Sequence, residues 1–369
     1  MSIQTAYSSQ ASPAEAVADV KKQLGSEPLK LLLFFASTQY DPTVLAKAVN
    51  DAFPGTPHLG CTTAGEITSG LMLEKSLVVM AFGTDALADV NIQLVLEPAN
   101  PAAVMQALMN FEQHFGEPIA ALDMDRYVGL VLVDGMGGAE ETLMEGLGDA
   151  TDVLFVGGSA GDDLAFKATW VFSGGLAHSN AAVLAILRPT GRFGFIKTQS
   201  FITLPKKLVA TQVDEPNRRV LEFDGKPAAV AYAEALSVSV ADASKRFMRN
   251  PVGLMAGDEP FVRSPQRFDG NAMVFYCNVK EGMELSLLES RDIVEDTTKA
   301  IEAKQKELGT FSAIVNFNCI LRTLELKAAG QMDAYGKVFA GVPTIGFSTY
   351  GEEFLGHINQ TATMLVFAR

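Results

Sequence analysis

Residues 56–66 read TPHLGCTTAGE, and residues 342–352 read VPTIGFSTYGE. Each copy has a proline, an apolar strand start, an internal glycine, hydroxyl residues and a closing Gly-Glu pair. A related copy at 153–162 reads VLFVGGSAGD, and a weaker one at 250–258 reads NPVGLMAGD. The closing glycines, at positions 65, 161, 257 and 351, are spaced by 96, 96 and 94 residues. This regular spacing predicts repeated units of about a hundred residues.

The neighbourhood of each copy is also similar. An apolar stretch and a helical segment come before it, and another apolar stretch follows, as in LVVMAF at 77–82 and TMLVFA at 363–368. The sequence therefore predicts a mixed α/β fold of four related strand-helix-strand-strand units that pair into two sheet-based halves. Because the copy at 250–258 is weak, a single fold in which the strand–turn pattern recurs by chance stays open as an alternative.

The predicted boundaries follow from turn and cap residues. Ser12-Pro13 begins a helix that Gly25 ends, which predicts an N-terminal helical segment over 1–27. The polar stretch that contains Lys206-Lys207 and Glu215-Pro216 predicts a linker. We therefore expect a first domain at 28–203, a linker at 204–226 and a second domain at 227–369.

Charge and composition exclude several classes of protein. The 369 residues carry a net charge of −14, which repels phosphate backbones and anionic lipids, so we expect no nucleic-acid partner. Apolar stretches such as 181–187 are too short to span a bilayer, and the first residues lack the pattern of a signal peptide, so no membrane insertion is expected. The cysteines Cys61, Cys277 and Cys319 are far apart, which is typical of a reduced cytoplasm.

The acidic residue after a closing glycine has two interpretations. It can bind a ligand in a cleft between repeated units, or it can accept hydrogen bonds within its own turn. Glu66 and Glu352, in the two best-matched copies, are the first candidates for ligand binding. The pattern G-x-S-x-G at 157–161 is typical of a hydrolase, but a strand rather than a helix is expected after it. With no convincing pair of nucleophile and base, we expect a protein that is not an enzyme.

The chain resembles the FIST family of bacterial sensory proteins over nearly its whole length. The resemblance rests on LAKAVNDAFPGTPHLGCTTAGEI and VGGSAGDD in the first half, and on YAEAL, DEPFVRSP, FNCILR and GFSTYGEEFLGHINQT in the second. It implies an N-terminal and a C-terminal FIST domain that sense a small ligand in signal transduction. One branch of the family, the NosP-type proteins, comprises haem-based nitric oxide sensors that regulate a separate histidine kinase.

That branch implies haem b as a cofactor of this chain. His357 is the expected axial ligand of the haem iron, because it lies inside the family's terminal motif, where Phe347, Tyr350 and Phe354 could supply apolar walls. On residue chemistry alone, a lone histidine at this position is more often a hydrogen-bonded structural residue. Asn359 belongs to the same motif and is a further candidate for ligand binding.

Two arginines and a cysteine complete the candidate ligand-binding residues. Arg263 and Arg322 could clamp a carboxylate, either of a haem propionate or of an amino acid, or they could pair with Glu259 and Glu325. Cys319 ends an apolar strand, where it acts as a small buried apolar residue or as a thiolate beside a positive group.

The sequence therefore leaves two functions open. The first is a cytoplasmic haem-based sensor of nitric oxide that regulates a histidine kinase. The second is a receptor for a small organic ligand such as an amino acid, without haem. A homodimer is compatible with either.

Overall fold

A computed structural model describes residues 2–257 and 259–368 of the chain. The fold is mixed α/β, which confirms the predicted class. The chain forms two compact units. The first contains the residues up to Thr198, Thr298–His357 and the residues from Ala362 onward, and the second contains Gln199–Thr297 with Ile358–Thr361.

The first unit is built from three modules of the same plan. Module 1 begins with an edge strand and a helix, continues with a strand, a second helix and a parallel strand, and ends with a short hairpin and a last strand. Its elements are β1 (Ile3–Ser8), α1 (Pro13–Leu24), β2 (Leu29–Ser37), α2 (Pro42–Ala52), β3 (His58–Thr63), β4 (Glu66–Thr68), β5 (Leu71–Leu73) and β6 (Leu77–Gly83).

Module 2 repeats this order. The helix starts follow from the sequence, because Asn100 caps α3 and Pro101 occupies its first turn, where a missing N–H costs nothing. The elements are β7 (Leu87–Leu96), α3 (Pro101–Phe115), η1 (Ile119–Ala121), β8 (Val128–Val133), α4 (Glu140–Ala150), β9 (Phe155–Ser159), β10 (Val171–Ser173), β11 (Leu176–His178) and β12 (Ala181–Pro189).

Module 3 has the same order of elements, but the second unit is inserted after its first strand. Modules 1 and 2 continue directly from that strand into their first helix, whereas module 3 reaches its first helix about a hundred residues later. Its elements are β13 (Phe193–Gln199), α7 (Ile293–Leu308), β22 (Phe311–Cys319), α8 (Ile320–Ala328), α9 (Met332–Lys337), β23 (Thr344–Thr349), β24 (Glu352–Phe354), β25 (His357–Ile358) and β26 (Thr361–Ala368).

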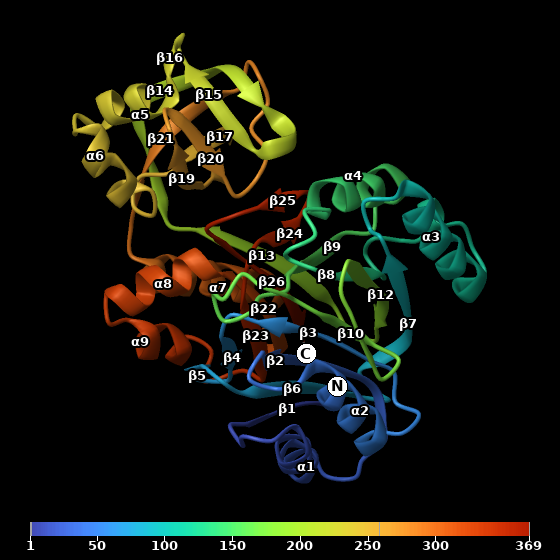
Figure 1. Ribbon diagram of the computed structural model, residues 1–369. Helices are drawn as coiled ribbons and strands as arrows, with labels where there is room; N and C mark the ends of the chain where they lie inside the picture. The colour runs from blue at the N-terminus through green and yellow to red at the C-terminus, as the bar shows by residue number, and fades with distance from the viewer. Residues whose placement is uncertain (1, 258, 369) are drawn as a thin grey trace. The chain divides into compact units, whose positions relative to one another are not determined.

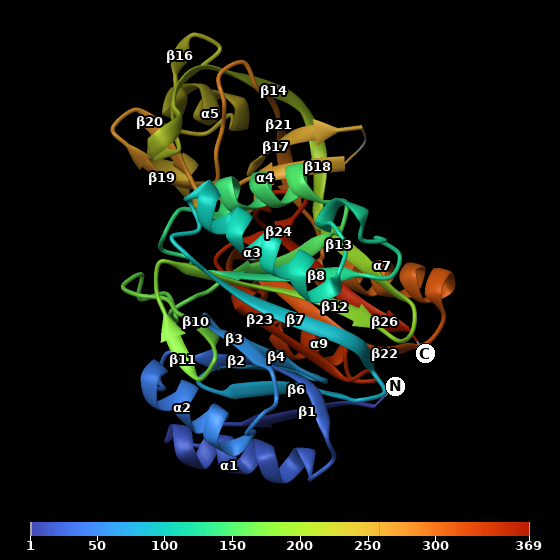
Figure 2. The same cartoon turned by 90° about the vertical axis from the view of Figure 1, so that its right-hand side faces the viewer.

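The three modules exchange their short hairpins in a cycle. Module 1 gives β4–β5 to the sheet of module 3, module 3 gives β24–β25 to the sheet of module 2, and module 2 gives β10–β11 to the sheet of module 1 (Figure 2). The three resulting sheets have equivalent orders, β1-β6-β2-β3-β10-β11, β7-β12-β8-β9-β24-β25 and β13-β26-β22-β23-β4-β5. The closing turns at 65–66, 161–162 and 351–352 are the points where the chain crosses to the neighbouring sheet.

The internal glycine of the repeat allows two parallel strands to approach closely. Gly60, Gly157 and Gly346 occupy the same position in β3, β9 and β23, opposite Phe34, Val131 and Asn316. A Cβ atom on these glycines would lie 2.2, 1.7 and 2.2 Å from the carbonyl oxygen of that partner. No side chain can be accommodated at such distances, so the position requires glycine.

The apolar core lies between the three sheets. Phe35 of β2, Leu132 of β8 and Phe317 of β22 belong to one continuous cluster of buried side chains. The opposite faces of the first two sheets pack against helices, α1 and α2 in module 1 and α3 and α4 in module 2 (Figure 1). No helix within residues 2–257 and 259–368 has the length and the apolar character needed to cross a bilayer.

The second unit contains a single antiparallel sheet and a separate apolar core. Tyr232 and Phe223 are fully buried in this core. Its elements are β14 (Phe201–Asp214), η2 (Glu215–Asn217), β15 (Arg219–Phe223), β16 (Lys226–Pro227), α5 (Ala228–Leu236), α6 (Val240–Ala243), η3 (Ser244–Arg246), β17 (Val252–Ala256), β18 (Glu259–Arg263), β19 (Pro265–Asp269), β20 (Ala272–Phe275) and β21 (Glu284–Ser290).

Three sequence-based expectations differ from this arrangement. The copy at 250–258 is not a fourth unit, because the described partners of β17 are antiparallel strands. A Cβ atom on Gly253 would also meet side chains rather than a backbone oxygen. Asp258 itself lies outside the described residues. Residues 204–226, expected to be a linker, form most of β14 and all of β15, because their alternating apolar residues pack in the core of the second unit. The expected helical segment 1–27 contains α1, but β1 precedes it.

Candidate functional site

Glu66 is buried inside its own turn. Its carboxylate accepts hydrogen bonds from the backbone N–H of Ser76 at 3.0 Å, from the hydroxyl of Ser76 at 2.6 Å and from the hydroxyl of Thr63. Burial raises the pKa of Glu66 from 4.5 to about 8, although these donors oppose the shift. The side chain therefore carries a proton at neutral pH, and its contacts are those of a residue that stabilises a turn.

Tyr350, like Glu66, makes contacts that stabilise a loop. Its hydroxyl donates to Asp162 at 2.5 Å and accepts the N–H of Leu164 at 3.0 Å, while its ring stacks on Phe166 with 5.0 Å between centroids. Asp162 also accepts the N–H groups of Phe166, Lys167 and Ala168. Burial and the bond to Asp162 raise the pKa of Tyr350. Tyr350 thus holds the loop that follows the second repeat.

Arg322 and Cys319 lie at the junction of β22 and α8. Arg322 is 2% exposed, and its Nε donates to Oδ1 of Asn318 at 3.0 Å, which also accepts from the hydroxyl of Tyr335. Cys319 is buried opposite Thr349 in the strand register, as expected for a small apolar residue. These residues belong to a packed polar network of the first unit, whereas Arg263 lies on β18 of the second unit.

The remaining candidates are buried along the last turns of the chain. Glu352 is fully buried on β24, opposite Gly158 of β9. Asn359 is 1% exposed and belongs to the second unit, and within the described residues its amide nitrogen and oxygen have no hydrogen-bond partner. Arg322, Glu352 and Glu66 belong to the first unit, whereas Arg263 and Asn359 belong to the second.

His357 forms a buried ion pair with Glu353. The Nδ1 atom lies 2.9 Å from Oε1 of Glu353, and the two side chains are 2% and 0% exposed. Burial disfavours the charged imidazolium, but the carboxylate of Glu353, with smaller contributions from Glu140 and Glu141, raises the pKa of His357 from 6.5 to about 10. The imidazole is therefore charged at neutral pH and is held by its partner.

Ser159 connects this pair to the start of α4. Its hydroxyl lies 3.2 Å from Oε1 of Glu140 and 3.4 Å from Oε1 of Glu353. The serine of the G-x-S-x-G pattern thus donates to carboxylates and makes no hydrogen bond to His357 within the described residues. The chain continues from β9 through a loop to strand β10, so the strand–turn–helix geometry of a hydrolase nucleophile is not formed.

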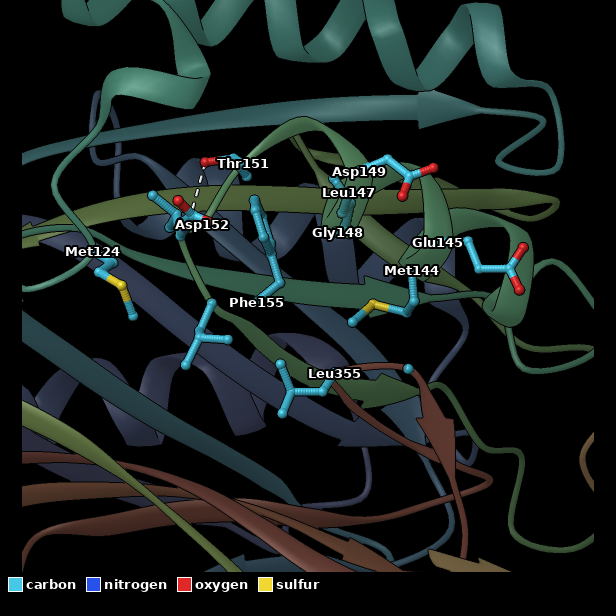
Figure 3. A pocket seen from close by; sticks show the side chains of 13 residues that line it. Met124, Met144, Glu145, Leu147, Gly148, Asp149, Thr151, Asp152, Phe155 and Leu355 are labelled. Atoms are coloured by element: carbon cyan, nitrogen blue, oxygen red, sulfur yellow. Dashed lines mark hydrogen bonds between the residues drawn. The ribbon is translucent and has the colours of Figure 1, made fainter. Parts of the chain in front are cut away.

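A groove of about 420 Å³ lies beside the buried pair. Figure 3 shows Phe155 and Leu355 in its middle, Met124 at one end and Met144 at the other. The remaining lining comes from the end of α4, the loop before β9 and the β24–β25 turn, namely Glu145, Leu147, Gly148, Asp149, Thr151, Asp152, Val153, Leu154 and Gly356. A mostly apolar hollow of this size is typical of a small-molecule site.

The groove and the buried pair share one turn of the chain. Leu355 and Gly356, which line the groove, are the residues between Phe354 of β24 and His357 of β25. This turn is tight: Leu355 has a φ of 53° and the N–H of Phe354 donates to the carbonyl of Gly356 at 2.9 Å. A shift of the turn therefore changes the distance between Glu353 and His357.

The surroundings of His357 do not fit a haem. A Cβ atom on Gly351 would lie 2.0 Å from Cε1 and 2.9 Å from Nε2 of His357, so the edge of the ring that would face an iron packs against that backbone. Phe347, expected as a wall of the slot, packs in the apolar core 4.5 Å from Phe35 between ring centroids. An iron-bound histidine needs an open slot on one side of the ring. The groove is lined by residues other than His357 and Phe347.

Sequence reasoning identified His357 but not its partner or the groove. Glu353 and His357 are four residues apart on either side of a glycine, which is a detectable spacing in a hairpin. The groove has no such signal, because residues 124, 144–155 and 355–356 meet only through the hairpin exchange between modules 2 and 3.

Comparison with known proteins yields two family matches and a distant relative. Residues 30–226 match the model of the FIST N domain, and residues 228–354 match that of the FIST C domain. An uncharacterized protein of Methanocaldococcus jannaschii is 23% identical over 265 residues, which cover 66% of this chain. The chain spans about half of that relative, 51% of its length.

Proposed function

Because the chain belongs to the FIST family, whose domains are small-ligand sensors of signal transduction, we propose that it is such a sensor and that its groove receives the ligand. One observation carries the proposal: the residues that line the groove include the turn that joins Glu353 to His357. A ligand that contacts Leu355 changes the position of this turn.

The proposed signal passes from the turn into the sheet of module 2. Glu353 lies opposite Gly157 of β9 and is bonded to Ser159, which ends that strand. The pair is buried, and electrostatic interactions inside a protein are stronger than at its surface. A small movement of the turn therefore has a large effect on the pair, and the pair transmits it to β9 and to Glu140 at the start of α4.

The recipient of the signal that we propose is a separate histidine kinase, which is what the resemblance to the NosP-type branch of the family implies. A cytoplasmic location and a homodimer are parts of the same proposal. The acidic chain, with its net charge of −14, favours a partner surface that carries basic residues.

The groove is tested by a thermal-shift screen of a metabolite library against the wild-type protein and the Leu355→Asn variant. A true ligand at about a hundredfold over its Kd stabilises the folded state by about 2.7 kcal/mol, which raises the Tm by several degrees. We expect the variant to lose most of this shift, because a neutral polar amide replaces the apolar side chain in the middle of the groove without changing its charge. In the wild type the same ligand is expected to shift the imidazole nitrogen resonances of His357.

Leu176→Asn is the matched control, because Leu176 is 59% exposed on β11 and Leu355 is 67% exposed on its turn. The control should keep the shift. Ligands that stabilise both variants equally, and that leave the His357 resonances in place, would contradict the proposal.

Haem b remains the alternative cofactor, since a carboxylate-bonded histidine such as His357 is the usual arrangement of a metal-ligating imidazole. The packing around the imidazole ring predicts that His357 does not bind the haem iron. Hemin titration of the purified protein is therefore expected to give no Soret band that depends on His357. A band that appears in the wild type and is lost in His357→Ala, with protein folding unchanged by circular dichroism, would restore the haem-based nitric oxide sensor.

A further inference from the structure

The charges around the groove are all of one sign. Three exposed carboxylates, those of Glu145, Asp149 and Asp152, stand at its edge (Figure 3), and none of its lining residues is a lysine, arginine or histidine. None of the three carboxylates forms an ion pair or a side-chain hydrogen bond with another of the described residues. Their charge is therefore available to a ligand.

The end of α4 adds to this negative potential. The helix ends at Ala150, and its last turn, which lines the groove, contains no basic residue. The carbonyl groups at the C-terminus of a helix carry a partial negative charge that favours a cation. The apolar floor of Met144, Phe155 and Leu355 lies directly beside this charge, so the groove presents an apolar surface with a negative edge.

We propose that the groove selects a small organic cation, an ammonium group on an apolar body, and discriminates against carboxylates. The inference rests on the proposed function in that the groove is the ligand site. An α-amino acid is a poor match, because its carboxylate would lie among three like charges with no basic residue to pair with. The flexible thioethers of Met124 and Met144 suit apolar bodies of different shape.

The test uses three probes with the same six-carbon body, hexylammonium, 1-hexanol and hexanoate, and isothermal titration calorimetry at low ionic strength. We expect hexylammonium to bind about tenfold more tightly than 1-hexanol, which corresponds to two or three exposed charge interactions of the usual size. Hexanoate should bind more weakly than 1-hexanol. The advantage of the ammonium is expected to disappear at high salt, because exposed charges are screened.

The double variant Asp149→Asn/Asp152→Asn is expected to lose the preference for hexylammonium and to keep the affinity for 1-hexanol. Its matched control is Glu27→Gln/Glu281→Gln, which removes the same charge at exposed sites outside the groove and should leave the preference intact.

Equal binding of hexylammonium and 1-hexanol would overturn the cation selectivity. If Leu355→Asn still removes the stabilisation by metabolites, the groove would nevertheless remain the ligand site. A lysine-rich amphipathic peptide that displaces hexylammonium and binds far more tightly would overturn the assignment to a small molecule. If the preference for hexylammonium is lost in Asp149→Asn/Asp152→Asn and kept in Glu27→Gln/Glu281→Gln, the result supports the proposed cation selectivity.

Discussion

Gly157→Ala is expected to lower the free energy of unfolding by about 3 kcal/mol or more, at the upper end of what overpacking costs. A Cβ atom at this position would lie 1.7 Å from the carbonyl oxygen of Val131 and 2.6 Å from its carbonyl carbon. Because the clash is with backbone, no side-chain rotation can relieve it. The parallel pair β8–β9 must separate, and with it the β24–β25 hairpin bonded to β9.

Urea unfolding with an unchanged m-value measures this loss. Gly146→Ala is the control: Gly146 is inside α4, the nearest atom to its added Cβ is a methyl carbon of Val104 at 3.7 Å, and alanine is the better helix former. That variant is expected to be slightly more stable than the wild type. Gly346→Ala, the equivalent change in module 3, should resemble Gly157→Ala. A Gly157→Ala protein within about 1 kcal/mol of wild type would show that the close strand approach is not required.

Glu353→Ala is expected to cost about 3–5 kcal/mol at neutral pH, since it leaves the imidazolium of His357 buried without its counter-charge. The pH dependence identifies the cause. The folded-state pKa of His357, about 10, lies above its ordinary value of 6.5. Proton binding therefore stabilises the folded state fully below pH 6.5, and this stabilisation is lost as the pH rises toward 10.

The measurement is the difference in unfolding free energy between variant and wild type at several pH values from 6 to 9.5. Working with the difference cancels the contribution of Glu66, whose raised pKa also makes stability fall as pH rises toward 8. We expect the difference to shrink with rising pH, because the wild type loses its advantage. Glu353→Gln retains an acceptor for Nδ1–H and should cost less than the alanine variant. A difference independent of pH would contradict a charged pair.

Local structure was predictable where short-range chemistry decides it. The cap residue Ser12, followed by proline, begins α1 as expected, and Asp41 and Asn100, also followed by proline, begin α2 and α3 by the same chemistry. The continuous apolar stretches became buried strands, among them β2, β8 and β22, because strands covered on both faces need no polar alternation. The repeat also marked the correct turns in three of its four copies.

The pairing between modules was not predictable, because it depends on contacts between distant parts of the chain. The short strands β4, β10 and β24 have three residues each that pair with the neighbouring sheet, too few to show a period. The copy at 250–258 matched in spacing alone. Glu66 and Tyr350 were found as residues of the repeat, but the sequence could not decide between a ligand contact and a turn contact. Glu353 went unnoticed beside Glu352, since only the fold decides which of two adjacent acids meets the histidine.

The cyclic hairpin exchange has a consequence for the origin of the chain. A polypeptide that consisted of one such module would have a hairpin with no strand to pair with and a sheet with an unprotected edge. When three copies are arranged in a ring, every hairpin pairs with the sheet of a neighbouring copy and no hairpin is left unpaired. This is the closed geometry of a homotrimer. The chain thus has the architecture of a domain-swapped trimer fused end to end, and fusion freed each third to diverge, so that module 3 could accept an insertion and the junction of modules 2 and 3 could form the groove.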